Sequence, residues 1–264
     1  MKHISSKENA IYKDALKLTR KKYRDQSGLF LLEGIKALKD ETGAAVDVEH
    51  VFIDELKYDE LSENDAWIIG LEDRTCLLDN RLFRELTDTE TSQGVVSVVR
   101  KPEISKDDFK KLSSDGNVVV LDRLQDPGNI GTIIRTAEAA GYAGIVAVKG
   151  TADIYAPKIV RAAAGSLLRM PVIQCDNARS ASELLHEAGK KLTVTCLAGA
   201  SNCFEVDLTK NIALVIGNEG RGVSREFLDL ADIRVMIPMR GRIESLNAAV
   251  AAGILMYQSV GGKI

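Results

Sequence analysis

The second half of the chain alternates short apolar runs with helix-like segments, and this alternation constrains the fold more than any other feature. Val118–Leu121 is a continuous apolar run, which is typical of a strand covered on both faces. Strands of this kind separated by helices predict a parallel sheet with helices on both sides. We expect strands at 118–121, 145–148, 172–174, 192–197, 212–216 and 235–237, and helices at 129–140, 157–165, 181–190, 224–231 and 246–260.

The first hundred residues predict a smaller mixed α/β unit. A helix from Ser5 to Arg24 is expected to precede a strand at 29–32. The polar segment 100–108 contains a proline and is the best linker candidate, so we expect domains at 1–104 and 112–264. The remaining expected elements are a helix through Ile35, Leu38 and Lys39, and strands at 48–53, 67–71 and 95–99.

Composition excludes several classes of protein. With 45% hydrophobic and 28% charged residues among 264, the chain is typical of ordinary folded domains. Its net charge of -3 argues against a uniformly basic nucleic-acid binder. No apolar run approaches the roughly 18 residues of a membrane span, and the first residues lack the apolar core of a signal peptide. We therefore expect a soluble, cytoplasmic protein with no membrane partner.

The cysteines and histidines predict no metal site. The chain has four cysteines without a C-x-x-C pair, and its three histidines lie far apart in the sequence. Scattered thiols without an export signal are most simply reduced core residues. The four are Cys76, Cys175, Cys196 and Cys203.

A basic segment stands out near the start of the chain. Residues 1–40 hold ten Lys and Arg against five Asp and Glu, although the whole chain is acidic. On a single helix, Lys13, Lys17, Lys21 and Arg24 would form one stripe. A solvated helix face is the ordinary interpretation of such a stripe, and an RNA-phosphate surface is the functional one.

Three loops that follow expected strands carry the chemical information, since ligands of parallel sheets bind at the carboxyl ends of strands. The first runs from Asp122 into a helix, with Asn129 at its start and Arg135 further along. The second is the glycine-rich turn 217–222, whose glycine spacing does not match dinucleotide or P-loop fingerprints. The third, 237–247, leads into an Ala/Gly-rich helix, and Asn129 or Asn247 could serve simply as helix caps.

Together the three loops resemble the SpoU/TrmH family of S-adenosylmethionine-dependent RNA ribose 2′-O-methyltransferases. The likeness covers about residues 117–260, with the three motifs in the family's order. No single loop is specific alone, but the combination is. The matching positions are Asn129, Gly131, Arg135 and Ala137, then Gly217, Glu219, Gly220 and Gly222, then Ile237, Pro238, Met239, Ser245, Leu246 and Asn247.

This resemblance implies the fold, the cofactor and the roles of the residues. The C-terminal domain would contain a deep trefoil knot, would bind S-adenosylmethionine (AdoMet) without a metal, and would form a homodimer. Catalytic roles are implied for Asn129, Arg135, Glu219, Ser245 and Asn247. Cofactor contacts, largely through backbone groups, are implied for Leu197, Ala198, Gly199, Gly217, Ile237 and Leu246.

The N-terminal unit resembles the family's substrate-binding domain through the short motif Phe30–Gly34. That domain is similar to a small ribosomal protein that binds RNA, which favours the RNA interpretation of the basic stripe. It also favours ribosomal RNA over tRNA as the substrate. Two alternatives stay open: a nicotinamide-dependent oxidoreductase, which lacks its glycine fingerprint here, and a noncatalytic RNA-binding or ribosome-assembly factor on the same fold.

Overall fold

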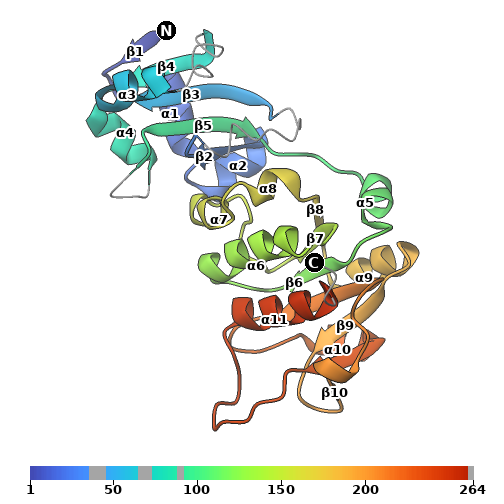
Figure 1. Ribbon diagram of the computed structural model, residues 1–264. Helices are drawn as coiled ribbons and strands as arrows, with labels where there is room; N and C mark the ends of the chain where they lie inside the picture. Colours follow the sequence, from blue (N-terminus) through green and yellow to red (C-terminus); the bar gives the residue numbers. More distant parts are fainter. Residues whose placement is uncertain (36–45, 65–72, 88–91, 261–264) are drawn as a thin grey trace. The chain divides into compact units, whose positions relative to one another are not determined.

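The computed structural model describes residues 1–35, 46–64, 73–87 and 92–260 (Figure 1). Its contacts divide the chain into two compact units, each with its own sheet. The N-terminal unit comprises Met1–Pro102 and Asp153–Leu168, and the C-terminal unit comprises Glu103–Ala152 and Arg169–Ile264. The expected domains, 1–104 and 112–264, are each continuous in sequence. In the structure, the segment 153–168 belongs instead to the N-terminal packing unit.

The N-terminal unit is built on a five-stranded mixed sheet in the order β1-β4-β3-β5-β2. β4 pairs in parallel with β1 and β3, while β5 pairs antiparallel with β3 and β2. Buried side chains of α1 and α4, including Tyr12 and Leu82, share a core with Phe52 of the sheet. The strands are β1 (Lys2–Ile4), β2 (Leu29–Glu33), β3 (Val48–Asp54), β4 (Thr75–Leu78) and β5 (Val95–Arg100), and the helices are α1 (Ala10–Lys17), α2 (Lys21–Ser27), α3 (Tyr58–Asn64) and α4 (Asn80–Leu86).

The expected single helix from Ser5 to Arg24 is wrong, because the segment forms two helices. Asn9 caps α1, its side chain accepting hydrogen bonds from the backbone N–H groups of Ile11 and Tyr12. After α1 the backbone tightens into i→i+3 turns, with the N–H of Arg20 donating to Lys17 O at 3.0 Å. Lys21 therefore begins a second helix, and the four basic residues do not form one stripe.

Segment 153–168 lies between two strands of the C-terminal sheet along the chain but packs with the N-terminal unit. The guanidinium of Arg24 donates to the Asp153 carboxylate from Nε at 2.8 Å and from Nη2 at 2.5 Å. The rings of Phe30 and Tyr155 are 5.0 Å apart between centroids. The segment holds α7 (Pro157–Ala162) and most of α8 (Ser166–Arg169), and α7 contacts β2.

The C-terminal unit is built on a seven-stranded sheet in the order β10-β12-β9-β11-β6-β7-β8, and every pair is parallel. This confirms the α/β class predicted for this half of the chain. The strands are β6 (Val118–Asp122), β7 (Gly144–Val148), β8 (Val172–Cys175), β9 (Lys191–Thr195), β10 (Ser201–Asn202), β11 (Ile212–Gly217) and β12 (Ile233–Met236). The helices are α5 (Lys106–Ser113), α6 (Pro127–Ala139), α9 (Ala178–Glu187), α10 (Arg225–Leu230) and α11 (Ala248–Val260).

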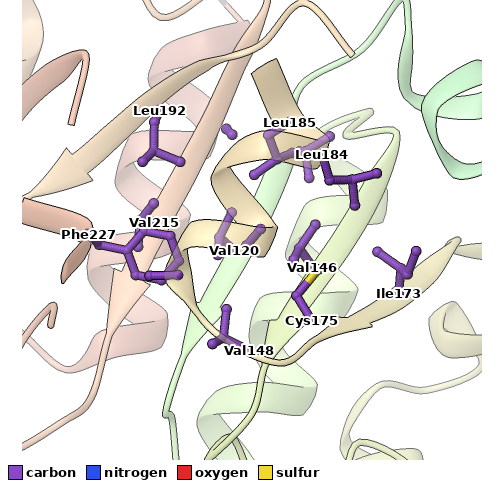
Figure 2. Packing of buried hydrophobic residues seen from close by; sticks show 14 of the residues in the cluster. Val120, Val146, Val148, Ile173, Cys175, Leu184, Leu185, Leu192, Val215 and Phe227 are labelled. Atoms are coloured by element: carbon purple, nitrogen blue, oxygen red, sulfur yellow. The ribbon is translucent and has the colours of Figure 1, made fainter. Parts of the chain in front are cut away.

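Side chains alternate between the two faces of this sheet, and one face carries a core cluster shared with α9 and α10. Val120, Val146 and Val215 point from their strands toward Leu184 of α9 and Phe227 of α10 (Figure 2). These side chains are all less than 5% exposed. The continuous apolar runs of the sequence thus correspond to strands buried on both sides.

α6 and α11 pack against each other in the C-terminal unit. A Cβ on Gly253 would lie 3.9 Å from Cγ2 of Thr136, and Ser259 Oγ donates to the Tyr142 hydroxyl at 3.1 Å. The small residues of α11 therefore allow the close helix packing that the sequence suggests. α6 begins at Pro127 after the N-cap Asp126, whose carboxylate accepts from the N–H of Asn129.

Two expected elements cannot be compared with the structure. The helix through Ile35, Leu38 and Lys39 falls almost wholly on 36–45, and the strand at 67–71 falls on 65–72, both outside the described residues. No helix among the described residues is long and apolar enough to cross a membrane.

Candidate active site

The three loops singled out by the sequence meet at one edge of the parallel sheet. They follow β6, β11 and β12, and a fourth loop at 196–199 follows β9. These strands are neighbours in the order β12-β9-β11-β6, and in a parallel sheet their carboxyl ends share one edge. The fold therefore gathers four loops that are far apart in the sequence.

Glu219 links the second loop to the first. Its carboxylate accepts hydrogen bonds from the backbone N–H groups of Gln125 at 3.1 Å and Asp126 at 3.0 Å, and from Nδ2 of Asn129 at 3.2 Å. Partial burial alone would raise the pKa of Glu219, but these donors stabilise the anion and hold the pKa below its usual value. The carboxylate is therefore ionised at neutral pH, and its hydrogen bonds hold the second loop against the first.

Asn247 links the third loop to the first. Its Nδ2 donates to Oδ1 of Asn129 at 2.8 Å, while its own Oδ1 accepts from the N–H groups of Ala249 and Val250. Asn247 thus caps α11 and also holds Asn129 in place. Asn129 is not the cap of α6, because Asp126 takes that position, and its 8% exposed side chain is free to bridge Glu219 and Asn247.

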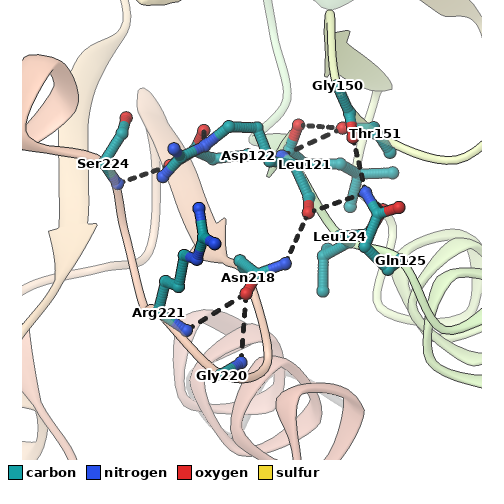
Figure 3. Close-up of polar contacts among 11 residues, drawn as sticks. Leu121, Asp122, Leu124, Gln125, Gly150, Thr151, Asn218, Gly220, Arg221 and Ser224 are labelled. Carbon is teal, nitrogen blue, oxygen red and sulfur yellow. Dashed lines mark hydrogen bonds and ion pairs between the residues drawn. The ribbon is translucent and has the colours of Figure 1, made fainter.

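A second network, which the sequence analysis missed, shapes the glycine-rich loop (Figure 3). Asn218 Oδ1 accepts from the N–H groups of Gly220 and Arg221, and its Nδ2 donates to the carbonyl of Arg123 at 2.8 Å. Buried Asp122 accepts from the N–H of Ser224 at 2.6 Å, which ties the end of this loop to β6. The preference of Asn for turns that bond their own backbone was the available signal.

These loops enclose a cavity of about 580 Å³. That volume lies within the range of small-molecule sites. Its wall is apolar at Leu197, Ile237 and Leu246 and polar at Glu219 and Ser245. Five of the six residues expected to bind a cofactor line it, namely Leu197, Ala198, Gly217, Ile237 and Leu246, whereas Gly199 does not.

Gly217 is required by the loop's own closure. A Cβ at this position would lie 2.2 Å from the backbone nitrogen of Val223, far inside any permitted contact. The turn between β11 and Val223 therefore folds back directly over Gly217, and the Asn218 and Gly222 backbones pair across it. The glycine at position 217 of this turn therefore has a specific steric cause, since any side chain there would collide with the backbone of Val223.

Arg135 lies outside this cavity. It projects from α6 as an exposed side chain, and neither a hydrogen bond nor an ion pair is recorded for it among the described residues. The structure thus brings Asn129, Glu219 and Asn247 into one hydrogen-bonded cluster, with Ser245 on the cavity wall. It does not bring Arg135 into that cluster within one chain.

The basic residues of the N-terminal unit divide into two kinds. Lys13, Lys17 and Lys21 are exposed, with Lys13 paired to Glu8 and Lys17 to Asp14. Arg24 is 3% exposed and bonds Asp153 and the carbonyl of Leu18. The expectation that Arg24 faces RNA is corrected, because its guanidinium is buried and forms an ion pair with the carboxylate of Asp153.

The cysteines match the core prediction in three cases. Cys76, Cys175 and Cys203 are buried, but Cys196 is half-buried and lines the cavity. Among the described residues no group of His, Cys, Asp and Glu side chains has the arrangement of a metal site.

A parallel sheet whose carboxyl edge brings four loops around one cavity defines an α/β protein with a cavity of small-molecule size at its strand ends. Comparison with known proteins gives the family. Residues 116–257 match the SpoU rRNA Methylase family, and residues 9–97 match an MRM3-like substrate binding domain. The chain belongs to the SpoU family.

Individual relatives cover nearly the whole chain. It is 36% identical to the 23S rRNA (guanosine(2553)-2′-O)-methyltransferase RlmP of Bacillus subtilis over 97% of this chain and 98% of that protein. The AdoMet-bound rRNA methyltransferase from Sinorhizobium meliloti matches with a TM-score of 0.84 and 30% identity, covering 98% and 97% of the chains. The SpoU methyltransferase AviRb from Streptomyces viridochromogenes, in complex with AdoMet, matches with a TM-score of 0.85 and 31% identity, covering 97% and 98%.

The residues present fit AdoMet. A nucleoside with an amino-acid tail needs an apolar slot for its base and backbone or polar groups for its hydroxyls and charges. The cavity supplies both, with Leu197, Ile237 and Leu246 beside the glycine-rich turn. AdoMet therefore fits the cavity, where the backbone and side chains of loops 196–199, 217–222 and 237–247 are available to contact it.

Proposed function

We propose that this chain transfers a methyl group from AdoMet to a ribose 2′-hydroxyl of ribosomal RNA. The observation that carries the proposal is the cluster of Asn129, Glu219 and Asn247, which locks three loops together beside the 580 Å³ cavity. RlmP and the Sinorhizobium meliloti protein are described as rRNA methyltransferases, and the solved structures of the Sinorhizobium meliloti protein and of AviRb contain AdoMet. Ribosomal RNA is favoured over tRNA by the N-terminal substrate-binding domain.

The residues divide the work of an in-line displacement. AdoMet, when bound, supplies a methyl group on a sulfonium, so the protein has to orient the ribose hydroxyl and assist loss of its proton. Ser245 and Asn247 lie where the cavity meets the third loop. Arg135 holds the RNA phosphate and stabilises the developing alkoxide, because a guanidinium stays protonated and is a poor base.

Arg135 acts in a homodimer formed through the C-terminal domain. It stands on α6, beside α11, and α11 exposes Val250 and Tyr257 at positions seven residues apart on one face. A partner covering this face would bury the apolar side chains and present Arg135 to a second chain. The same proposal includes the trefoil knot in the C-terminal domain, a cytoplasmic location, and RNA contacts through Lys13, Lys17 and Lys21.

The test is titration calorimetry with AdoMet and, separately, NAD. We expect AdoMet to bind near one equivalent per chain and NAD not to bind. Gly217→Ala should abolish AdoMet binding, because its Cβ meets backbone at 2.2 Å, whereas Gly241→Ala, whose Cβ meets nothing within 4 Å, should bind normally. NAD binding in place of AdoMet would refute the proposal. AdoMet binding without methyl transfer to any rRNA transcript would favour the noncatalytic factor.

A further inference from the structure

The segment between Ile237 and Ser245 carries exposed side chains to which the proposed chemistry assigns no role. Residues 238–245 are all exposed, and the run Met239–Ile243 reads Met-Arg-Gly-Arg-Ile. Ile243 is 70% exposed and Met239 37% exposed. Two arginines flanked by two exposed apolar side chains form a surface that nothing in the described C-terminal unit covers.

The arginines of this surface have no carboxylate partner. No hydrogen bond or ion pair is recorded for the side chains of Arg240 and Arg242 among the described residues, nor for that of Arg221, which lines the cavity rim. Other arginines of the same unit are paired, as Arg225 is with Asp229 at 3.0 Å. The cavity lining includes Arg221, Glu219 and Glu244, and the adjoining segment adds Arg240 and Arg242, so three guanidinium groups stand against two carboxylates. This local excess of positive charge, in a chain of net charge -3, favours an anionic partner.

The segment lies within short reach of the proposed reaction site. Arg242 precedes Ser245 by three residues and Arg240 by five, so extended chain puts their Cα atoms at most about 11 Å and 18 Å away. Those distances correspond to a few nucleotides on either side of a target ribose. The opposite edge of the sheet, where β9 and β11 begin, lies at the other end of both strands from the loops that line the cavity.

We propose that Met239–Ile243 binds single-stranded RNA next to the target nucleotide, with Arg240 and Arg242 on phosphates and Ile243 against a base. This inference rests on the proposed function and adds a substrate contact on the catalytic unit itself. Unstacked RNA is recognised by charge along the backbone and by apolar or planar side chains against the bases. Met239 and Ile243 supply the second component, which a merely solvated pair of arginines would lack.

The experiment compares Arg240→Gln/Arg242→Gln with a matched control, Lys191→Gln/Lys210→Gln. The control removes the same charge from exposed residues at the amino ends of β9 and β11, on the far edge of the sheet. Binding of a 20-nucleotide mixed-sequence RNA is measured at several salt concentrations. Methylation of a 23S rRNA transcript and AdoMet affinity are measured alongside.

We expect the arginine variant to bind RNA on the order of tenfold more weakly and to lower the salt slope by about 1.4, which corresponds to two single-strand phosphate contacts. Its KM for the transcript should rise while its AdoMet affinity stays at the wild-type value. Ile243→Ser should weaken binding without changing the salt slope. The control should match the wild type in every measurement.

Two results would overturn the inference while leaving the proposed function standing. One is a wild-type RNA affinity and salt slope in the arginine variant of an enzyme that methylates rRNA. The other is a change of that variant from dimer to monomer in light scattering, with RNA affinity lost only because the dimer dissociates. That result would make the surface an interface between two copies of the chain. Failure of the wild-type protein to bind AdoMet would instead refute the proposed function.

Discussion

Glu219 is the residue on which the arrangement of the loops depends most. Its carboxylate accepts from two backbone N–H groups of the first loop and from Asn129, so one side chain satisfies three donors. Glu219→Ala should lower the free energy of unfolding of the C-terminal unit by about 1–2 kcal/mol. Hydrogen bonds to charged groups contribute about 1.5–3 kcal/mol, and solvent reduces that contribution at an exposed carboxylate. Denaturant titration followed by circular dichroism measures the change in the free energy of unfolding. Glu226→Gln, an exposed glutamate of α10, is the control and should be neutral.

The same residue predicts a pH dependence. The pKa of Glu219 is lowered from its ordinary value of 4.5, so its stabilising contribution is complete above pH 4.5 and is lost as pH falls through the folded-state pKa. The difference in stability between wild type and Glu219→Ala should therefore be constant from pH 8 to about pH 5 and should shrink below that. A difference that persists unchanged at pH 3 would mean that the carboxylate's charge is not what holds the loops.

Single residues also mark the limit of what the sequence predicts. Asn129, Glu219 and Asn247 were identified because their motif positions recur together, and the structure joins them by hydrogen bonds. Arg24 was misassigned because its spacing suits a helix stripe, while its partner Asp153 lies 129 residues away along the chain. Asn218 was not identified because its side chain bonds nearby backbone groups, and such bonds leave no residue spacing that a sequence motif would show.

At the scale of elements, strands buried on both faces were the easiest to predict. The runs at 118–121 and 212–216 correspond to β6 and β11 within one residue, because short continuous apolar runs rich in β-branched residues are typical of strands covered on both faces. The N-terminal helix was overextended, because amphipathic periodicity passes through the break at Leu18–Arg20 where the backbone tightens. β1 and β10 were missed because strands of three and two residues are too short to show an alternation of apolar and polar side chains.

α11 makes a prediction about assembly. Its exposed Val250 and Tyr257 lie on one face, 52% and 49% exposed, beside α6 with Arg135. If the C-terminal domain forms the dimer, Val250→Lys/Tyr257→Lys should give a monomer in light scattering at micromolar concentration and should lose activity. Leu112→Lys, a 59% exposed apolar residue on α5, serves as the control and should stay dimeric. A wild-type protein that is monomeric and fully active would contradict the assignment.

At the scale of the whole molecule, the chain combines two units with different tasks. The mixed-sheet unit matches a substrate-binding domain and carries the exposed Lys13, Lys17 and Lys21, while the parallel-sheet unit holds the cavity. The overall charge of -3 conceals this division, because the basic residues are concentrated in the first forty positions, which hold ten Lys and Arg against five Asp and Glu. The net charge alone therefore argues against a uniformly basic nucleic-acid binder, whereas the distribution of charge along the chain favours an RNA-binding surface in the N-terminal unit.

The most direct test of the central claim is a map of ribose 2′-O-methyl groups in rRNA from cells with and without this protein. We expect one methylated ribose to disappear when the protein is removed, to return with the wild-type chain, and to stay absent with Arg135→Ala. In vitro, that variant should retain AdoMet affinity and lose at least about 100-fold in turnover, the scale of a lost transition-state donor. An identical methylation map with and without the protein, or full restoration by Arg135→Ala, would contradict the account.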